Sequence, residues 1–431
     1  MAVSPAVPAL MSPEYEANTV EVFELLRDEH PLHYDESIEA WLVSRHEDIR
    51  TVFRHPQVTS DNYAWQFEEL HGRTILQMDG REHTQHRRQL NPFLTGAGLE
   101  SFVPVIARTA HATLAPILAR ESEAVGRDLL EPIVEREAAA IVRGERSAAR
   151  FDLVTEFARL YPIAVTREML GVPHEHHDKI AEWYLSMGST ISNLDKSEDP
   201  IERGRRTRRE VAEYFLPIIA ERRRGDGQDL ISLLARAEID GQGISDEAIR
   251  AFISLILIAG GETTDTGTAN LFRHLMTHPE QMAAVYEDRE LVADAIAESL
   301  RFTPPVQMIL RVPAADIEVT GGTIPAGATV ACVLAASNRD PRKFERPDEF
   351  DIFREDNSTA RAFRASADHL TFGDGRHFCA GAMLAQVEMT IAANLILDQM
   401  SGPPRFPEGF APEEHGVWFR GPETLPIEFD P

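Results

Sequence analysis

The residues best suited to chemistry surround one of the two cysteines of this chain. Cys379 lies in the segment FGDGRHFCAG, residues 372–381, in which three glycines permit unusual backbone or a close approach. The following residues, AMLAQVEMTIAANLIL, predict a helix, so the thiol precedes a helix N-terminus, which favours a thiolate. Such a sulfur can be a nucleophile, a redox thiol or a soft metal ligand. The alternative is a buried structural cysteine, and the nearby Arg376 and His377 argue against it.

A second group of residues interrupts an apolar segment. Ala259, Gly260, Gly261, Glu262 and Thr263 follow the run LILI. Each glycine costs a helix interior ~1 kcal/mol relative to alanine, and burying an acid is expensive. Residues that disfavour a buried helix often mark a functional site when several of them occur together. The gap left by the glycines can admit a small ligand, Thr263 can bond to it, and Glu262 can relay protons. A helix kink or close helix packing, with a solvated Glu262, remains open.

Two further groups are charged pairs on predicted helices. Glu298 and Arg301 are three residues apart and share a helix face that ends before Pro304. His83 and Arg87 are four residues apart, and together they can hold a carboxylate. In isolation, an ordinary solvated surface is the more common explanation of each pair.

The pattern of the whole chain predicts a mainly α fold with a small β portion. Residues 309–333 show β-branched alternation broken by Gly and Pro, and residues 31–44 predict a hairpin before a short helix. Residues 246–278 contain no proline and, if helical throughout, would be roughly 50 Å long and cross the domain. No linker is visible, so residues 1–431 are expected to form one domain. Other helices are predicted over 80–92, 101–140, 152–170, 177–190 and 205–224.

Composition excludes several classes of protein. The 431 residues include 43 Lys and Arg against 70 Asp and Glu, a net charge of −27, which argues against binding to nucleic acid or anionic membranes. Two cysteines cannot form a disulfide framework. The longest apolar run, residues 251–260, is too short to span a membrane, and the N-terminus does not resemble a secretory signal. A soluble cytoplasmic protein is therefore expected.

Taken together and in this order, the motifs resemble the cytochrome P-450 family of haem-thiolate monooxygenases, of the soluble bacterial type. FGDGRHFCAG resembles the cysteine loop of that family, AGGETT its oxygen-groove motif, and Glu298 with Arg301 its Glu-x-x-Arg pair. DGREHTQHRR is similar to the C-helix segment of bacterial members. The resemblance covers nearly the whole chain and implies the cytochrome P-450 fold, with a long central helix next to haem.

The resemblance also implies a role for each motif residue. Cys379 would be the axial ligand of the iron of haem b, and Phe372 would pack near it. Ala259 and Gly260 would border dioxygen, while Glu262 and Thr263 would deliver protons. Glu298 and Arg301 would be structural. The haem propionates would be held by His83, Arg87, Arg311 and His377.

One departure from the family pattern concerns the Glu298–Arg301 pair. Many members supply a third partner from the arginine of a Pro-Glu-Arg-Phe segment, where this chain has Glu349. Arg354 is a possible substitute for that arginine.

The implied reaction inserts one oxygen atom into a C–H or C=C bond of an apolar small molecule. NAD(P)H would supply the electrons through a separate ferredoxin and ferredoxin reductase, because two cysteines cannot ligate an iron–sulfur cluster. Since the chain is acidic, docking of a ferredoxin needs a local basic patch. The protein itself is expected to be a monomer. Candidates for that patch are His86, Arg87, Arg88, Arg342, Lys343 and Arg376. The resemblance would place the substrate pocket among residues 61–78 and 170–195, Leu255 and Ile258, and Val306–Ile309. Trp65, Phe67, Met187 and Met308 would form an apolar lining, although each is also compatible with a core position.

Two other activities stay open from the residues alone. One is a peroxide-driven haem-thiolate peroxygenase, and the other is a non-catalytic haem sensor or ligand carrier. Glu262 and Thr263 favour the oxygen-dependent reaction, because an enzyme that starts from peroxide needs less proton relay.

Overall fold

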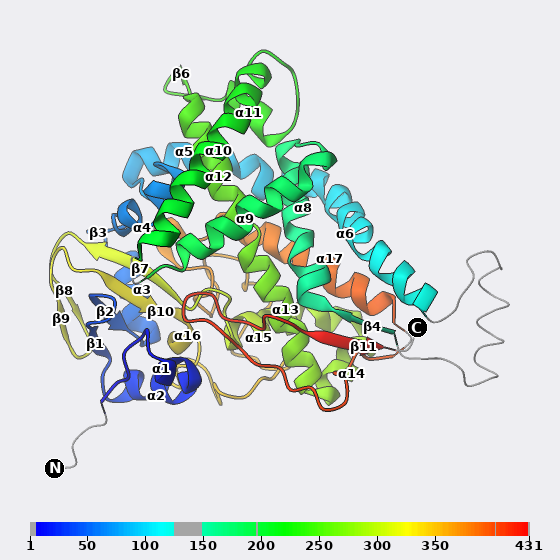
Figure 1. Cartoon of the computed structure of the whole chain (residues 1–431). Helices are drawn as coiled ribbons and strands as arrows, with labels where there is room; N and C mark the ends of the chain where they lie inside the picture. The colour runs from blue at the N-terminus through cyan, green and yellow to red at the C-terminus, as the bar shows by residue number, and fades with distance from the viewer. Residues whose placement is uncertain (1–5, 125–148, 195–196, 401, 430–431) are drawn as a thin grey trace, which may run out of the picture.

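The computed structural model describes residues 6–124, 149–194, 197–400 and 402–429. Helices make up most of the molecule, and a small sheet lies at one side (Figure 1), as the sequence predicts. Residues 125–140 of the helix predicted over 101–140 lie outside the described part. The α-helices are α1 Pro13–Ala17, α2 Thr19–Asp28, α3 His46–Arg54, α4 Asn62–His71, α5 Gly80–Leu94, α6 Gly96–Ala124, α8 Leu160–Leu170, α9 His177–Ile191, α10 Glu198–Arg222, α11 Leu230–Arg236, α12 Asp246–Ala259, α13 Glu262–Thr277, α14 Pro279–Glu287, α15 Val292–Phe302, α16 Leu334–Ser337 and α17 Ala382–Asp398. Shorter helical segments are the π-helix η1 Leu153–Ala158 and the 3-10 turns η2 His174–His176, η3 Arg289–Leu291 and η4 Gly375–His377.

The sheet joins the N-terminal hairpin to the strands predicted over 309–333. Its strand order is β1-β2-β10-β7-β3, in which β2 and β10 run parallel and the other neighbours antiparallel. The predicted hairpin forms with Leu32 opposite Val43. The strands are β1 Leu32–Asp35, β2 Ala40–Val43, β3 Val58–Thr59, β4 Ala149–Asp152, β5 Glu238–Ile239, β6 Gln242–Gly243, β7 Met308–Pro313, β8 Ile317–Val319, β9 Gly322–Ile324, β10 Val330–Val333 and β11 Pro426–Phe429.

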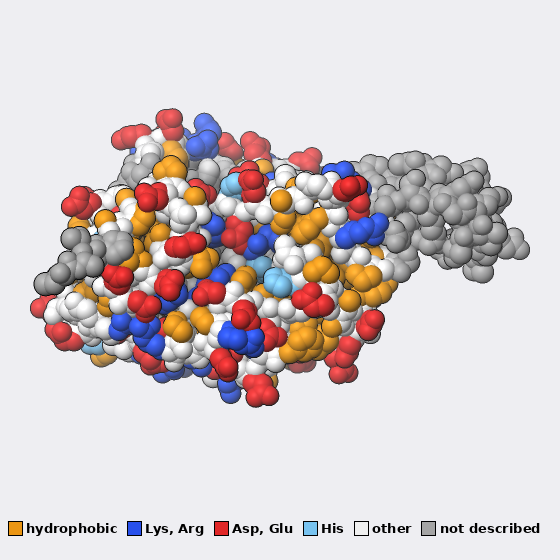
Figure 2. Space-filling view, turned by 90° about the horizontal axis from the view of Figure 1, so that it is seen from below, with side chains coloured by type: hydrophobic (Ala, Val, Ile, Leu, Met, Phe, Trp, Pro, Cys, Tyr) orange, Lys and Arg blue, Asp and Glu red, His pale blue; other side chains and the backbone are white. Residues whose placement is uncertain are grey.

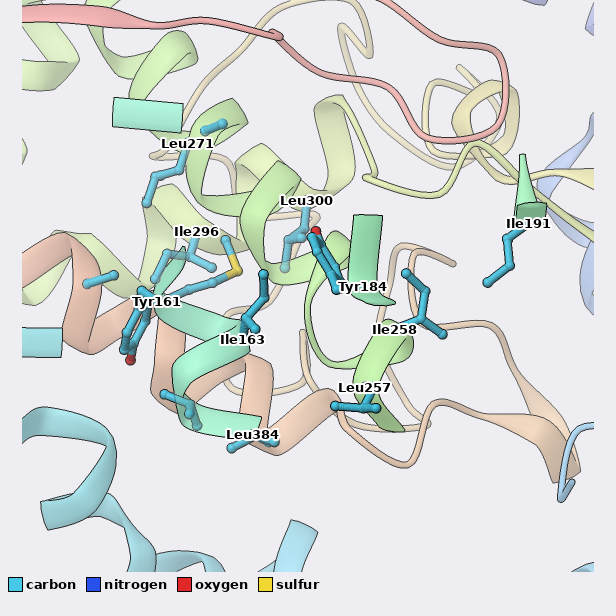
Figure 3. Close-up of a cluster of buried hydrophobic side chains, with 14 of the residues drawn as sticks. Tyr161, Ile163, Tyr184, Ile191, Leu257, Ile258, Leu271, Ile296, Leu300 and Leu384 are labelled. Carbon is cyan, nitrogen blue, oxygen red and sulfur yellow. The ribbon is translucent and has the colours of Figure 1, made fainter. Parts of the chain in front are cut away.

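The central helix predicted over 246–278 is present but interrupted. It forms α12 and α13, which are separated at Gly260 and Gly261, so a continuous helix of roughly 50 Å does not exist. The two helices lie in the middle of the molecule (Figure 1), with α12 packed on α8, α9 and α10 and α13 packed on η1, α15 and α17. Figure 3 shows the side chains between these helices, including Tyr161, Tyr184, Leu257 and Leu384.

One of the described helices, α6, has a stretch that is long and apolar enough to cross a membrane by length and composition alone, Gly96–Ala119. Polar residues interrupt this stretch, so it was not predicted from unbroken apolar runs. The stretch contains Pro104 and Pro116, and α6 packs on α5, α8 and α17 of the same molecule. A single helix of this kind is weak support for a membrane span.

Glu298 and Arg301 form a buried ion pair and not a surface one. Arg301 Nε and Nη2 each donate to a carboxylate oxygen of Glu298 at 2.7 Å, and both side chains are almost completely inaccessible. Arg354 supplies the third partner, with its Nε 2.9 Å from Glu298 Oε1. Glu349 contributes only its backbone carbonyl to Arg301, while its side chain pairs with Arg346 at the surface. The substitution of partner expected from the sequence is therefore confirmed.

Replacing Arg354 by methionine should lower the free energy of unfolding by about 3 kcal/mol, because it leaves part of a buried carboxylate uncompensated. The control is Arg346→Met in the same segment, which removes an exposed pair and should cost under about 1 kcal/mol. Urea unfolding curves of the purified variants measure both values. Equal losses would show that burial of the Glu298 cluster does not set its contribution.

Candidate active site

The loop that carries Cys379 is held in shape by its own backbone and by α3. Cys379 N–H donates to the carbonyl of Phe372 at 2.9 Å. Gly375 has φ +69°, and a Cβ there would lie 2.7 Å from the carbonyl oxygen of Phe53. A side chain at that position is therefore excluded both by backbone conformation and by space.

An aspartate inside this loop ties it to α3 by charge. Asp374 is buried and accepts from Arg54 Nε at 2.8 Å and from Arg50 Nε at 3.3 Å. Its Oδ1 also accepts from the N–H of Gly375 at 2.6 Å. Asp374 therefore fixes the turn that precedes the cysteine.

The thiol of Cys379 faces a cavity inside the protein. Protein surrounds the side chain, yet its surface is open to that cavity just before the first turn of α17. Burial raises the pKa of the thiol, while the N–H groups of Gly381 and Ala382 and the charge of Arg87 oppose that rise. The effect of the helix terminus expected from the sequence is present, but desolvation outweighs it.

Four basic side chains line the same cavity, as predicted. They come from α5, β7 and the cysteine loop, and are His83, Arg87, Arg311 and His377. The rings of His83 and His377 lie 4.3 Å apart. His377 Nε2 is 3.1 Å from Asp79 Oδ1. Burial, followed by the charge of His377, lowers the pKa of His83 to about 4.

The two arginines of this group are matched to an anion. Arg87 Nη1 donates to the carbonyl of Arg376 at 3.4 Å, and Arg311 Nη1 donates to the carbonyl of Leu310 at 2.7 Å and to the Tyr63 hydroxyl at 3.3 Å. Within the described part of the chain, neither arginine has a carboxylate partner. Buried cations without a counter-charge are costly, so the cavity suits a ligand with carboxylates of its own. The two propionate groups of haem would fit this donor set, and the Cys379 thiol lies in the same cavity.

The helix break forms the other wall of the cavity. Ala259, Gly260 and Thr263 all line it, and Thr263 Oγ1 donates to the Ala259 carbonyl at 3.1 Å. A Cβ on Gly260 would lie 3.1 Å from Thr166 Oγ1, and one on Gly261 would lie 2.5 Å from Tyr184 Cε2. Close helix packing, one of the two interpretations of the sequence, is therefore confirmed at both glycines, and Gly260 also lines the cavity.

Glu262 does not line this cavity. Its carboxyl group lies in a neighbouring polar pocket, beside Arg159 and Asp265. Burial raises the pKa of Glu262, and Tyr184 and Arg159 oppose that rise. Thr263 therefore lines the cavity, whereas the adjacent Glu262 lines the polar pocket.

Four of the apolar side chains predicted for the pocket line the cavity: Phe67, Leu255, Ile258 and Val306. The prediction is wrong for Met308, which is fully buried in β7 and absent from the lining. Side chains alternate along a strand, so Ile309 and Arg311 face the cavity and Met308 faces away. Met187 is likewise a core residue of α9. Trp65 belongs to α4, but its side chain lies outside the described part.

The sequence analysis missed a buried acid that lines the cavity. Glu388 in α17 is 1% exposed and interacts with the Thr264 hydroxyl, and burial raises its pKa to about 8. Its Oε2 has no hydrogen-bond partner within the described residues. The available signal was a single acid in the apolar helix AMLAQVEMTIAANLIL, a pattern similar to that of Glu262.

Known proteins resemble this chain along nearly its whole length. Pulcherriminic acid synthase of Bacillus subtilis is 36% identical over 424 residues, which cover 98% of each chain. The biotin biosynthesis cytochrome P-450 of the same organism is 30% identical, with 97% of this chain and 98% of that one covered. The crystal structure of CalO2 superposes with a TM-score of 0.82 at 26% identity and complete coverage of both chains.

A family model decides the assignment. The model described as cytochrome P-450 matches residues 14–401. The chain belongs to this family. Cytochromes P-450 are oxidoreductases, monooxygenases that use haem b and dioxygen and receive electrons from NAD(P)H through redox partners. Their substrates are small molecules. The fold expected from the resemblance is confirmed by this match and by the solved structures.

In this cytochrome P-450, Gly261→Ala should lower the free energy of unfolding by about 1–3 kcal/mol, because the new methyl group overlaps the Tyr184 ring. Gly260→Ala should cost less, since the Thr166 hydroxyl can move away. In a Tyr184→Ala background, most of the cost of Gly261→Ala should disappear. Thermal or urea unfolding of the four variants measures this coupling, and additive losses would contradict the packing argument.

Proposed function

We propose that this protein is a haem-thiolate monooxygenase in which Cys379 supplies the axial ligand of the iron. One observation carries the proposal: Cys379, four basic side chains and the helix break meet at a single cavity although they come from distant segments. We further propose that residues 1–431 form one domain and that the enzyme is a cytoplasmic monomer. One atom of dioxygen enters a C–H or C=C bond of the substrate, and the other leaves as water with two electrons and two protons.

Different side chains of the cavity would hold the iron, the carboxylates of haem and dioxygen. Cys379 would bind the iron of haem, Phe372 would pack near that cysteine, and His83, Arg87, Arg311 and His377 would hold the haem carboxylates. When bound, haem supplies the activation of dioxygen. Ala259 and Gly260 leave space for dioxygen because neither has a long side chain.

Proton delivery requires a path from water to the cavity. The Thr263 hydroxyl lies in the cavity, and the neighbouring Glu262 carboxyl lies in the polar pocket. A proton that enters from the pocket would reach Thr263 through Glu262, an acid whose pKa is raised by burial.

The distal part of the cavity favours an apolar substrate without charge. Besides the four predicted residues, the cavity lining includes the apolar side chains Ile75, Leu76, Met169, Ile191, Trp418 and Phe419. The charged groups of the lining are the basic residues assigned to haem and the buried Glu388. Binding of substrate should therefore depend on apolar contact and shape.

The carbon monoxide difference spectrum of the dithionite-reduced protein tests the ligand assignment. The wild-type protein and Cys332→Ala should both give the long-wavelength Soret band of a thiolate-ligated complex, because Cys332 lies buried in β10 and away from the cavity. Cys379→Ala should lose that band. A thiolate band retained in Cys379→Ala, or lost in Cys332→Ala, would show that the wrong cysteine was assigned.

We also propose that a ferredoxin docks beside the cysteine loop. Figure 2 shows acidic side chains distributed over one face of the molecule, so attraction of an acidic partner must be local. Of the six candidate residues, Arg342 and Lys343 are engaged by Asp28, Asp340 and Asp368, and Arg87 lines the cavity. Arg88 and Arg376 are exposed near the loop, which makes them the best candidates for partner binding.

Arg88→Glu and Arg376→Glu should each reduce ferredoxin-supported electron transfer several-fold at low salt, because each reverses a charge that attracts the partner. The reduction should shrink as ionic strength rises. The control is Arg206→Glu on the exposed face of α10, which should leave the rate unchanged. Stopped-flow reduction of the ferric protein by a ferredoxin measures the rates. Equal effects of all three variants would place docking elsewhere.

A further inference from the structure

A second carboxyl group lies beside Glu262, and the reaction assigned to the site does not use it. Asp265 follows Glu262 by three residues in α13, so the two side chains share one face of the helix. Asp265 is 5% exposed. Its Oδ2 is 3.6 Å from Nε of Arg159, which lies between η1 and α8. One guanidinium therefore faces two carboxyl groups.

Tyr184 of α9 completes this cluster from the opposite side. Its ring packs on Gly261, and its hydroxyl is close to both carboxyl groups. The hydroxyl has no well-formed hydrogen bond within the described residues, although it is fully buried. Burial and the two acids raise the pKa of Tyr184, so it stays a neutral donor that can serve either carboxyl group.

The cluster lies at the wall of the open polar pocket described above. Glu262, Asp265 and Arg159 line the pocket together with Ser192 and residues of the C-terminal segment. The titratable groups of that segment are His415 and Glu423. The groups that face Asp265 are thus Glu262 from its own helix, Arg159, Tyr184, and His415 and Glu423 across the pocket.

Two buried acids beside one arginine cannot both be charged cheaply. Burial and the charge of Glu262 raise the pKa of Asp265 to about 8, and burial raises that of Glu262. At neutral pH the pair therefore retains at least one proton. Water in the pocket can replace that proton after it is given up.

We propose that Asp265 is a positioning residue for proton delivery, which with Arg159 holds a proton shared with Glu262 at the inner end of the polar pocket. Glu262 gives its proton toward Thr263 and takes one from Asp265. A proton from bulk solvent, carried by water of the pocket, then returns to Asp265, so the charge of the pair is restored in each cycle. This inference rests on the proposed monooxygenase function.

The first test follows the shared proton by infrared spectroscopy of the haem-loaded protein across a pH series. In the wild-type protein, the carbonyl stretch of the protonated pair should be lost as the pH rises through about 8. In Asp265→Asn, the neighbouring acid is absent, so Glu262 should lose its proton at least one pH unit lower. Asp265→Glu should restore the wild-type midpoint. Because the pKa of Glu388 is also raised to about 8, each variant is compared with the wild-type protein at the same pH, where the unchanged Glu388 signal cancels.

The second test measures the fraction of electrons released as hydrogen peroxide during NADPH oxidation with a plant-type ferredoxin and its reductase. This readout needs no known substrate. In Asp265→Asn the peroxide fraction should rise several-fold at neutral pH and return to the wild-type value at lower pH. Glu423→Gln changes an exposed acid across the same pocket. It should leave the midpoint of the infrared titration and the peroxide fraction unchanged.

Three results would overturn the proposal. They are unchanged midpoints in Asp265→Asn, a peroxide fraction that rises equally at every pH, and an equal shift in Glu423→Gln. The second result would indicate a purely structural role for Asp265. Failure of the monooxygenase assignment is recognised separately, because the wild-type protein would then lack the thiolate band with carbon monoxide.

Discussion

The buried ion pair between Glu298 and Arg301 is the interaction on which the geometry of the site depends. Arg301 donates to the carbonyl of Asn338 at 2.9 Å, and the Asn338 amide in turn donates to Thr371 Oγ1 at 3.0 Å. Thr371 Oγ1 donates back to the carbonyl of Leu300 at 2.7 Å. Since Thr371 directly precedes the cysteine loop, a continuous series of hydrogen bonds connects α15 to the residues that present Cys379.

The break between α12 and α13 organises the opposite side of the site. A regular helix would present one continuous wall, but two glycines and a hydroxyl that bonds to the Ala259 carbonyl interrupt it. The interruption separates an apolar cavity from a polar pocket. Thr263 lines the cavity and the adjacent Glu262 lines the polar pocket, which is the arrangement on which the proposed proton delivery rests.

The sequence was most informative where the chemistry is local. The cysteine loop, the helix break and the basic residues of α5 are each contained in a short segment, so their types and spacing indicated their grouping. Burial was harder to predict because it depends on distant elements. The pair of Glu298 and Arg301 was compatible with a surface until α15 was seen inside the core.

Other features could not be predicted for geometric reasons. A shift of one residue along β7 exchanges the two faces of the strand, so Met308 was placed in the cavity that Ile309 actually lines. The cluster of Asp265, Arg159 and Tyr184 combines three separate elements, and no spacing in the sequence connects them. Arg354 was foreseen only because an acid occupied the position of the usual arginine.

The ion pair between the cysteine loop and α3 constrains when the loop can fold during synthesis. Arg54 and Asp374 form a close ion pair although 320 positions separate them in the chain. At about 5–20 residues per second, a ribosome needs roughly 15 to 60 s to add that length. The cysteine loop therefore cannot acquire its final shape on a nascent chain until almost all of the protein has been made. Arg54 of α3 lacks its ion-pair partner Asp374 during that time.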